Sequence, residues 1–376
     1  MRIAINTRLL VHGKMDGIGW FTYETTRRIV KEHPEHTFYL FFDRQPSPDF
    51  IFADNAIPVV LQPPARHPIL WWIFFELSVS MALKKYEIDL FVTPDGFMPV
   101  HTKVPTLSVI HDINFEHVND NLRPSHQRYM THFFPQYARN ATRIATVSEY
   151  SKQDIVETYH IDSKKIDVVY DGANDRYRPH SEEEKNAVRQ RFTGGKPYLV
   201  FISTILKRKN LANLLLAFDK IKQTDTEGLK LIVVGNRVWW QDELKQAYDG
   251  MLHKEDVIFP GHVEPSELAA LLSASEALVY PSYFEGFGIP ILEAMYAETA
   301  VIASRSTSMP EVGGDAVLYI DPASPDDIAH AICKLKSPGL RAELIEKGRL
   351  QREKFSWDKT SDLLWQSIIH STNRNS

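Results

Sequence analysis

The stretch that most constrains the fold of this chain runs from Leu278 to Ile302 and reads LVYPSYFEGFGIPILEAMYAETAVI. A short apolar run, Ala277–Tyr280, overlaps its start and is ended by Pro281, so we predict a buried strand there. A loop with two glycines follows, and Pro290 stands where a helix would begin. A second buried strand is predicted over Val301–Ser304. Strand, loop, helix and strand in this order are typical of a parallel α/β sheet.

The loop between the first strand and the helix has the features of a phosphate or diphosphate site. Gly286 and Gly288 let the backbone approach a ligand, and the helix N-terminus behind them presents free N–H groups and a positive dipole. Glu285 and Glu293 lie on either side of this site. Because a carboxylate repels phosphate, we expect these two side chains to bind hydroxyl groups, as of a sugar and a ribose. Taken alone, Glu293 has the position of an ordinary acid in a first helical turn.

Seven residues lie between Glu285 and Glu293, and they include Gly-Phe-Gly-Ile-Pro. The stretch resembles the Glu-x7-Glu element of the retaining GT-B glycosyltransferases of family 4. This resemblance implies an α/β fold of two Rossmann-like parallel-sheet domains that face each other across a cleft. It also implies a C-terminal helix that crosses back to the first domain. The chain departs from the family at residues 297–300, where Ala-Glu-Thr-Ala replaces the usual Cys-Gly-x-Pro and the helix loses its terminal glycine.

The pattern of predicted strands places a domain boundary near residue 178. With this boundary, the family resemblance implies an acceptor-side domain over residues 1–178, joined by a crossing helix over 357–376, and a nucleotide-sugar-binding domain over 179–356. A chain of 376 residues is long enough for two such cores. The strands that we predict outside the opening stretch are Arg2–Asn6, Phe38–Asp43, Ile88–Thr93, Pro105–His111, Thr142–Glu149, Lys165–Asp171, Pro197–Ser203, Leu229–Gly235 and Val257–Gly261.

Composition narrows the partners and the compartment. The net charge is −5 and no block of five like charges occurs, which argues against nucleic acid as a partner. The single cysteine, Cys333, excludes an internal disulfide and fits a reducing compartment. No run approaches the ~18 apolar residues of a membrane span, and the first residues are typical of a strand rather than a signal peptide. We therefore expect a cytoplasmic protein.

One apolar run leaves two interpretations open. Ile69–Phe75 consists of seven consecutive large apolar residues, more than one helical face needs. The run is either a helix buried between the sheet and a lid, or a surface that touches a lipid-linked acceptor or the bilayer interface. Residues 1–178 carry 20 Lys and Arg against 21 Asp and Glu, so the overall charge does not favour peripheral membrane contact.

Further candidate residues follow predicted strands. Gly17 lies in a glycine-rich turn after the first strand, where backbone can approach a phosphate. His111 ends a strand, at the edge where open α/β sheets bind ligands. Lys207, Arg208 and Lys209 follow the first strand of the second domain, and such a cluster is by itself often only a solvated turn.

The family resemblance gives these residues roles. Gly17 would meet the donor, and His111 would orient the donor or the acceptor near the reacting carbon. Arg208 and Lys209 would neutralise the donor diphosphate, whereas Lys207 takes a variable turn position. The catalytic set implied is His111, Lys209 and Glu285, and the substrate-binding set is Gly17, Arg208, Gly286, Phe287, Gly288, Ile289 and Glu293.

The implied activity is retaining transfer of a hexose from a nucleotide sugar to a glycan or lipid-linked acceptor during assembly of cell-surface polysaccharide. The basic loop has the form Thr-x-x-x-Arg-Lys-Asn, which is similar to bacterial mannosyltransferases and favours GDP-mannose over a UDP-hexose as donor. The chain contains no Asp-x-Asp pair, so we expect catalysis without a metal or another cofactor.

Two other classes of function remain open from the sequence. A nucleotide-sugar epimerase or a phosphorylase of similar build would use the same anion site, although a phosphorylase also needs a pyridoxal lysine, for which no signal is present. An inactive nucleotide-sugar-binding partner protein is the alternative that is not an enzyme. Such a protein would be expected to have lost Glu285, Lys209 or Glu293, and all three are present. The sequence does not indicate an oligomeric state.

Overall fold

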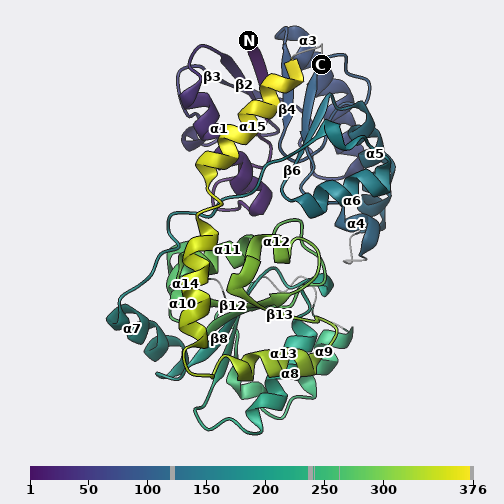
Figure 1. Ribbon diagram of the computed structural model, residues 1–376. Coiled ribbons are helices and arrows are strands. Elements are labelled where there is room, and N and C mark those ends of the chain that lie inside the picture. Colours follow the sequence, from purple (N-terminus) through teal and green to yellow (C-terminus); the bar gives the residue numbers. More distant parts are fainter. Residues whose placement is uncertain (119–122, 236–239, 241, 262, 373–376) are drawn as a thin grey trace. The chain divides into compact units, whose positions relative to one another are not determined.

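The computed structural model describes residues 1–118, 123–235, 240, 242–261 and 263–372. The chain forms two compact units (Figure 1). Unit 1 comprises residues 1–117, 122–172 and 356–376, and unit 2 comprises residues 118–121 and 173–355. Each unit is built on a sheet in which all described strand pairs are parallel, and each has its own apolar core. The predicted α/β class with two Rossmann-like domains is therefore confirmed.

Unit 1 contains a seven-stranded sheet in the order β3-β2-β1-β4-β5-β6-β7. Its central strands are buried along their whole length, as expected when helices cover both faces of a parallel sheet. The strands are β1 (Arg2–Asn6), β2 (Thr37–Phe42), β3 (Ala56–Val60), β4 (Leu90–Thr93), β5 (Thr106–Val109), β6 (Arg143–Thr146) and β7 (Ile166–Val168).

Helices cover both faces of this sheet. The helices are α1 (Gly17–Glu32), α2 (Pro68–Trp72), α3 (Ser80–Lys85), α4 (Asn114–His117), α5 (Pro124–Asn140), α6 (Glu149–Tyr159) and α15 (Trp357–Thr372), with a π-helical stretch over Ile73–Val79 and short 3-10 turns at Pro48–Phe50 and Ser163–Lys165. α1 packs against α15 on one face. α2 contacts α5, and α5 contacts α6, on the opposite face, as right-handed crossovers between parallel strands require (Figure 1).

The C-terminal helix belongs to unit 1, as we predicted for a helix that returns to the first domain. Within that unit, the indole of Trp365 stacks on the ring of His33 with centroids 3.6 Å apart, and Thr360 Oγ1 donates to the carbonyl of Tyr170 at 2.6 Å. Gly172 passes so close to the start of α15 that a Cβ there would lie 2.4 Å from the backbone nitrogen of Trp357. Only glycine fits at this crossing of the two chain segments.

Unit 2 contains a six-stranded parallel sheet in the order β10-β9-β8-β11-β12-β13. Its strands are β8 (Tyr198–Ile202), β9 (Lys230–Val234), β10 (Val257–Ile258), β11 (Ala277–Tyr280), β12 (Ala300–Ser304) and β13 (Val317–Ile320). Its helices are α7 (Glu182–Thr193), α8 (Leu211–Lys222), α9 (Asp242–Asp249), α10 (Pro265–Ser273), α11 (Ile289–Tyr296), α12 (Met309–Gly313), α13 (Pro325–Lys334) and α14 (Leu340–Arg352), with 3-10 turns at Lys207–Lys209, Lys254–Asp256 and Gly314–Ala316.

The end of α11 lacks the glycine that is usual in the family. Glu298, at the glycine position, adopts the left-handed conformation with φ of 55°. Its carboxylate pairs with Arg349 of α14 at 2.6 Å. The helix therefore ends where the family's glycine would end it, with a side chain that strains the backbone but gains an ion pair.

The apolar run over Ile69–Phe75 fits neither interpretation completely. Phe74 and Phe75 are fully buried in the core of unit 1, whereas the side chains of Ile69 and Trp72 are 68% and 44% exposed. Two residues of the run are thus core, two are surface, and the other three are partly buried. Among the described residues, no helix is long and apolar enough to cross a bilayer.

Candidate active site

The loop between β11 and α11 is held in place by its own neighbours in unit 2. Gly288 caps the helix in the left-handed region, with φ of 105°, and Pro290 lies in the first turn as predicted. The hydroxyl of Ser308 lies 2.9 Å from the carbonyl of Glu285 and 2.8 Å from that of Phe287. These contacts hold the loop in place within unit 2.

Glu285 lies in this loop with its side chain almost completely buried. Lys209, at the end of the 3-10 turn after β8, donates to its two carboxylate oxygens at 2.6 and 2.8 Å. Arg208 donates to the same carboxylate at 3.2 Å and to the carbonyl of Phe284 at 2.9 Å. Burial acts to raise the pKa of Glu285, but the charges of Lys209 and then Arg208 outweigh it and lower the pKa to about 2. Glu285 is therefore ionised throughout the working pH range.

This cluster brings together residues that the sequence predicted in two separate loops, Arg208 and Lys209 in one and Glu285 in the other. Lys209 also contacts the hydroxyl of Tyr280, at 3.2 Å, so all three hydrogens of its ammonium group have partners within the protein. Lys207 is different: it is half exposed and pairs with Glu243 at 3.3 Å, away from Glu285. Of the two lysines, only Lys209 belongs to the cluster.

The remaining loop residues present backbone rather than side chains. The ring of Phe287 is buried and lies edge-on to the ring of Phe355, with centroids 5.6 Å apart, so its side chain has a structural role. Gly286 and Gly288 are buried, and Ile289 opens α11 half-buried. The predicted anion site can therefore be formed only by main-chain N–H groups here.

Glu293 lies in α11 beyond the first turn, which contains no acidic residue, so its predicted first-turn position is wrong because the helix begins at Ile289. Its side chain is half-buried, and its carboxylate interacts with the hydroxyl of Tyr177. Burial raises the pKa of Glu293 to about 7, although the Tyr177 hydrogen bond and the charge of Arg176 oppose the rise. Burial, and then the charge of Glu293, also raise the pKa of Tyr177. Glu293 is therefore poised between its two protonation states near neutral pH, which an ordinary solvated first-turn acid would not be.

This position gives a prediction for pH dependence. An ionised carboxylate is the stronger acceptor for a ribose hydroxyl, so the affinity for a nucleotide sugar should rise as pH increases through about 7. The diphosphate of a nucleotide sugar does not titrate in this range, so calorimetry about one unit either side of pH 7 reports on titrating groups of the protein, and a variant of Glu293 assigns the change to its carboxyl group. Glu293→Gln should abolish the pH dependence and weaken binding by about 1.5–3 kcal/mol. An affinity for the native chain that does not vary with pH would contradict a ribose contact.

His111 lies just beyond β5 in unit 1, because the strand ends at Val109 and not, as predicted, at His111 itself. Its Nε2 lies 2.9 Å from the carbonyl oxygen of Pro94, and its ring lies edge-on to the ring of Phe21 with centroids 4.8 Å apart. Burial lowers the pKa of His111, while the Pro94 carbonyl and the charge of Asp112 oppose the fall. A carbonyl only accepts, so the neutral ring carries its proton on Nε2 and presents Nδ1 as an acceptor.

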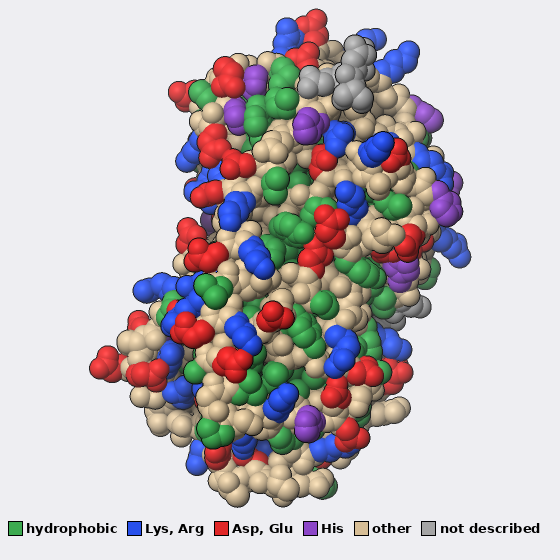
Figure 2. Space-filling model, in the orientation of Figure 1, with side chains coloured by type: hydrophobic (Ala, Val, Ile, Leu, Met, Phe, Trp, Pro, Cys, Tyr) green, Lys and Arg blue, Asp and Glu red, His purple; other side chains and the backbone are tan. Residues whose placement is uncertain are grey.

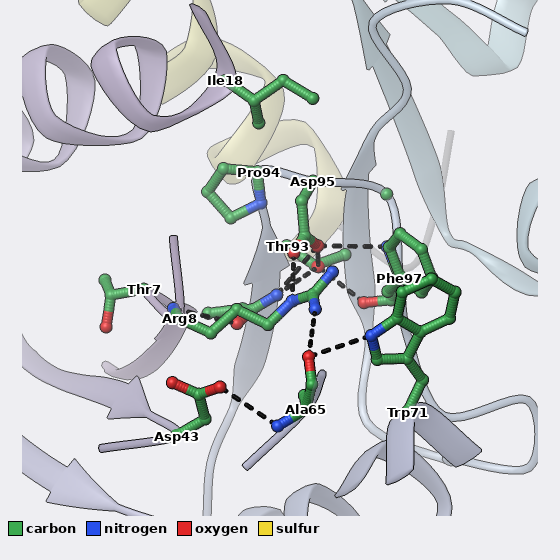
Figure 3. A network of polar contacts seen from close by, with 12 residues as sticks. Thr7, Arg8, Ile18, Asp43, Ala65, Trp71, Thr93, Pro94, Asp95 and Phe97 are labelled. Carbon is green, nitrogen blue, oxygen red and sulfur yellow. Dashed lines mark hydrogen bonds and ion pairs between the residues drawn. The ribbon is translucent and has the colours of Figure 1, made fainter. Parts of the chain in front are cut away.

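A buried polar network surrounds the turn that holds Pro94 (Figure 3). Arg8 Nε donates to Asp95 Oδ2 at 2.6 Å, and the Arg8 side chain lies over the ring of Phe97. Asp95 Oδ1 accepts from Asn6 Nδ2 at 2.8 Å, from Thr93 Oγ1 at 3.0 Å and from the Phe97 backbone at 3.2 Å. These groups come from the carboxyl ends of β1 and β4 and the turn after β4. The network fixes the turn whose carbonyl holds His111.

The sequence did not identify several residues in this region. Arg8 and Asp95 each follow a strand that we predicted. A cation and an acid at two strand ends of one sheet could have indicated this ion pair. Gly17 lies in the first turn of α1, and Asp16 caps that helix by accepting from the Gly19 nitrogen at 3.0 Å. The predicted glycine-rich loop is therefore partly helical. Asp16 is of a residue type that commonly caps helices, and it could have indicated that α1 begins at Gly17.

No metal-binding cluster is present in the part of the chain that the structure describes, where no three His, Cys, Asp or Glu side chains gather closely enough to hold an ion. Main-chain N–H groups of the loop before α11 can bind an anion, and Lys209 and Arg208, which are bound to Glu285, place positive charge beside that loop. Metal-independent catalysis stays a prediction.

Comparisons with known proteins agree with this architecture. Residues 15–177 match the family described as Glycosyltransferase Family 4, and residues 182–351 match the family described as Glycosyl transferases group 1. O-antigen chain mannosyltransferase B of Escherichia coli is 31% identical over 281 residues, which are 74% of this chain and 74% of that protein. O-antigen chain mannosyltransferase RfbU of Salmonella typhimurium is 29% identical over 256 residues, 68% of this chain and 67% of that protein.

Solved structures with the same fold have low sequence identity. The crystal structure of Anabaena HepE in complex with UDP-glucose has a TM-score of 0.75 at 16% identity, and covers 98% of this chain and 100% of that one. The structure of WaaG, a glycosyltransferase involved in lipopolysaccharide biosynthesis, has a TM-score of 0.72 at 15% identity, with 98% of this chain and 99% of that one covered. At these identities the likeness concerns the fold, which is GT-B.

Proposed function

The chain belongs to glycosyltransferase family 4, and from this premise we propose that it transfers mannose from GDP-mannose to a glycan or lipid-linked acceptor, with retention of anomeric configuration. The observation that carries the proposal is the buried cluster of Lys209, Arg208 and Glu285 beside the start of α11. The form of the basic loop and the activity named for the two O-antigen relatives support mannose. A UDP-hexose is the next donor to test, because HepE was crystallised with UDP-glucose.

We propose that unit 2 binds the donor. As the glycosidic bond breaks, negative charge grows on the leaving diphosphate, and the N–H groups before α11 with the cations of the cluster stabilise it. Glu285 accepts hydrogen bonds from hydroxyls of the donor sugar. Lys209 keeps that carboxylate ionised, so the two residues act as one unit.

The same geometry supports a same-face substitution over a double displacement. A double displacement needs a carboxylate that attacks the anomeric carbon. Both oxygens of Glu285 already bind cations, and its pKa of about 2 makes it a weak nucleophile. In the proposed course the acceptor oxygen bonds to the anomeric carbon, the bond to the phosphate oxygen breaks, and the acceptor proton passes to the leaving phosphate. His111, in unit 1, orients a substrate hydroxyl through Nδ1.

A thermal-shift screen with GDP, UDP, GDP-mannose and UDP-glucose, followed by a transfer assay with the donor that stabilises most, tests the proposal. A ligand that binds the native state at about 100 times its Kd stabilises it by about 2.7 kcal/mol, which is a measurable rise in Tm. We expect the guanosine ligands to give the larger shift. Stabilisation by the uridine ligands alone would overturn GDP-mannose as the donor. If none of the four ligands stabilises the protein, the proposed transferase activity is overturned.

We predict that EDTA leaves the rate of transfer essentially unchanged. Fixed cations, Lys209 and Arg208, supply the positive charge that a metal ion supplies in enzymes with an Asp-x-Asp pair. The rate should be measured with and without EDTA, and again after manganese or magnesium is restored. Loss of activity with EDTA and its recovery with either ion would contradict the prediction.

A further inference from the structure

A cavity of about 700 Å³ opens at the edge of the unit 2 sheet where its parallel strands end. Its walls come from the segments that follow three neighbouring strands, β11, β12 and β13, and from the first turn of α13. Open parallel sheets bind ligands at this edge, and the volume lies within the range of roughly 300–1,000 Å³ that is usual for small-molecule sites. We call this space the β12–β13 cavity.

The β12–β13 cavity adjoins the cluster of Arg208, Lys209 and Glu285 without containing it. Of the described residues, those that line the cavity include no member of the cluster and none of residues 286–288. Tyr283 links the two places, because it lines the cavity, lies two residues before Glu285 and donates its backbone N–H to the carbonyl of Arg208 at 2.8 Å. The proposed donor site and the cavity therefore share one loop but present different groups.

One wall of the cavity is an aromatic ring that is held in place. Tyr283 is 38% exposed, and its hydroxyl accepts a hydrogen bond from Asn213 Nδ2 at 2.9 Å. The same Nδ2 donates to the carbonyl of Pro322 at 2.9 Å. The ring is thereby tied to α8 and to the segment after β13, so it offers an apolar face to a ligand with little further loss of conformational entropy.

The cavity also presents one guanidinium group and two carboxylates. Arg305 is exposed, and one of its N–H groups donates to the carbonyl of Tyr319 at 3.3 Å. One oxygen of Asp321 accepts from the Ala323 nitrogen at 2.9 Å, and one oxygen of Asp327 accepts from the Asp321 nitrogen at 2.7 Å. Within the part of the chain that the structure describes, the other oxygens and the other N–H groups of these three side chains have no hydrogen-bond partner.

These groups match a neutral ligand that carries many hydroxyls. A sugar hydroxyl both donates and accepts, so it can pair with the free N–H groups of Arg305 and with the free oxygens of Asp321 and Asp327. One cation with two acids disfavours phosphate or another anion. In Figure 2, acids and cations are interspersed on the face of unit 2 where Figure 1 shows α8 and α13, so no field of one sign attracts a charged ligand there.

We propose that the β12–β13 cavity binds a neutral oligosaccharide, as a subsite that holds the glycan chain on which the enzyme acts. The ring of Tyr283 would pack against the apolar face of one sugar, and Arg305 with the two carboxylates would bind its hydroxyls. That the oligosaccharide belongs to the acceptor rests on the proposed transferase function, whereas the binding itself does not. A long acceptor that is held at a second point has a higher effective concentration of its reacting end.

Calorimetry of the full chain with a linear mannotriose, with and without saturating GDP, tests the subsite. We expect mannotriose to bind in both conditions, because the cavity does not overlap the groups proposed to bind the donor. Arg305→Ser should weaken binding by about tenfold or more, since hydrogen bonds to a charged group are lost. Tyr283→Leu keeps an apolar side chain but removes the ring, and should weaken binding several-fold. Because Arg305 is exposed, its replacement should leave the Tm and the response to GDP unchanged.

Arg191→Ser is the matched control, because it removes the same charge from an exposed side chain of unit 2 that does not line the cavity. It should bind mannotriose as the native chain does. The proposal is overturned if mannotriose does not bind the native chain, if both cavity variants bind it as tightly as the native chain, or if inorganic phosphate displaces it.

Transfer assays with acceptors of two lengths separate the subsite from the proposed function. In Arg305→Ser we expect the KM for a long glycan acceptor to rise, while kcat and the KM for a short acceptor stay as in the native enzyme. An unchanged KM for the long acceptor would overturn the assignment of the cavity to the acceptor chain. Binding of mannotriose that depends on Arg305, in a protein that none of the four donor ligands stabilises, would overturn the transferase but not the oligosaccharide site.

Discussion

Lys209→Ala is expected to lower kcat by about 10²-fold, the usual effect of removing one preorganised electrostatic contact from an active site. Its ammonium group is bound to both oxygens of Glu285 within a buried cluster. Removing it takes away positive charge beside the anion site and leaves the carboxylate with Arg208 as its remaining cation in the cluster. Because charge grows on the diphosphate as the bond breaks, the loss should fall mainly on kcat rather than on KM.

Lys207→Ala is the matched control, because it changes the net charge equally two residues away. Lys207 is half exposed and pairs with Glu243, so its removal should leave kcat nearly unchanged. A second measurement uses pH. Lys209 lowers the pKa of Glu285 against a burial effect that raises it, so without Lys209 this pKa should rise. If activity requires the ionised carboxylate, it is lost when the solution is made acid enough to protonate Glu285. In Lys209→Ala this loss should occur at a higher pH than in the native enzyme. Equal and mild losses in both variants would show that the cluster acts only as a diffuse positive field.

The opening stretch could be predicted closely from the sequence because its signals are local. A four-residue apolar run, a proline stop and a proline at a helix start depend only on neighbouring residues, and β11 occupies the predicted range. Elements that lack such local signals were not predicted. The edge strand β3 contains Pro58, which is tolerated there only because an edge strand need not donate on both sides, a fact that the sequence does not display. α5 was missed as well, and it contains Pro135 in its interior.

The pairings that create the site depend on topology, and no local pattern contains them. Lys209 and Glu285 are 76 positions apart and meet because β8 and β11 are neighbours in the sheet. Glu293 was predicted to bind a ribose, yet its pKa near 7 follows from burial that only the packed helix provides.

Asp95→Ala is expected to destabilise unit 1 by about 3–5 kcal/mol, which is typical when one partner of a buried ion pair is removed. Arg8 and Asp95 are both almost completely buried, and the pair distance is 2.6 Å. The variant would leave a guanidinium group in the core without its carboxylate, and would also deprive Asn6 and Thr93 of an acceptor. Glu87→Ala, which breaks the ion pair of Glu87 with Arg2 at the surface, is the control and should change little. Chemical unfolding of the full chain, followed by circular dichroism, compares the two.

The surroundings of Arg8 decide where in that range the effect falls. Without Asp95, the Nη1 of Arg8 would still donate to the carbonyl of Ala65, which lies 3.3 Å away. Its guanidinium carbon lies 4.7 Å from the ring centroid of Phe97, and such a cation–π interaction contributes about 2 kcal/mol when desolvated. These contacts favour the lower half of the range. A loss as small as that of Glu87→Ala would mean that they satisfy the buried cation by themselves. In that case Asp95 would serve chiefly to shape the turn that presents the Pro94 carbonyl to His111, and kcat would fall although stability did not.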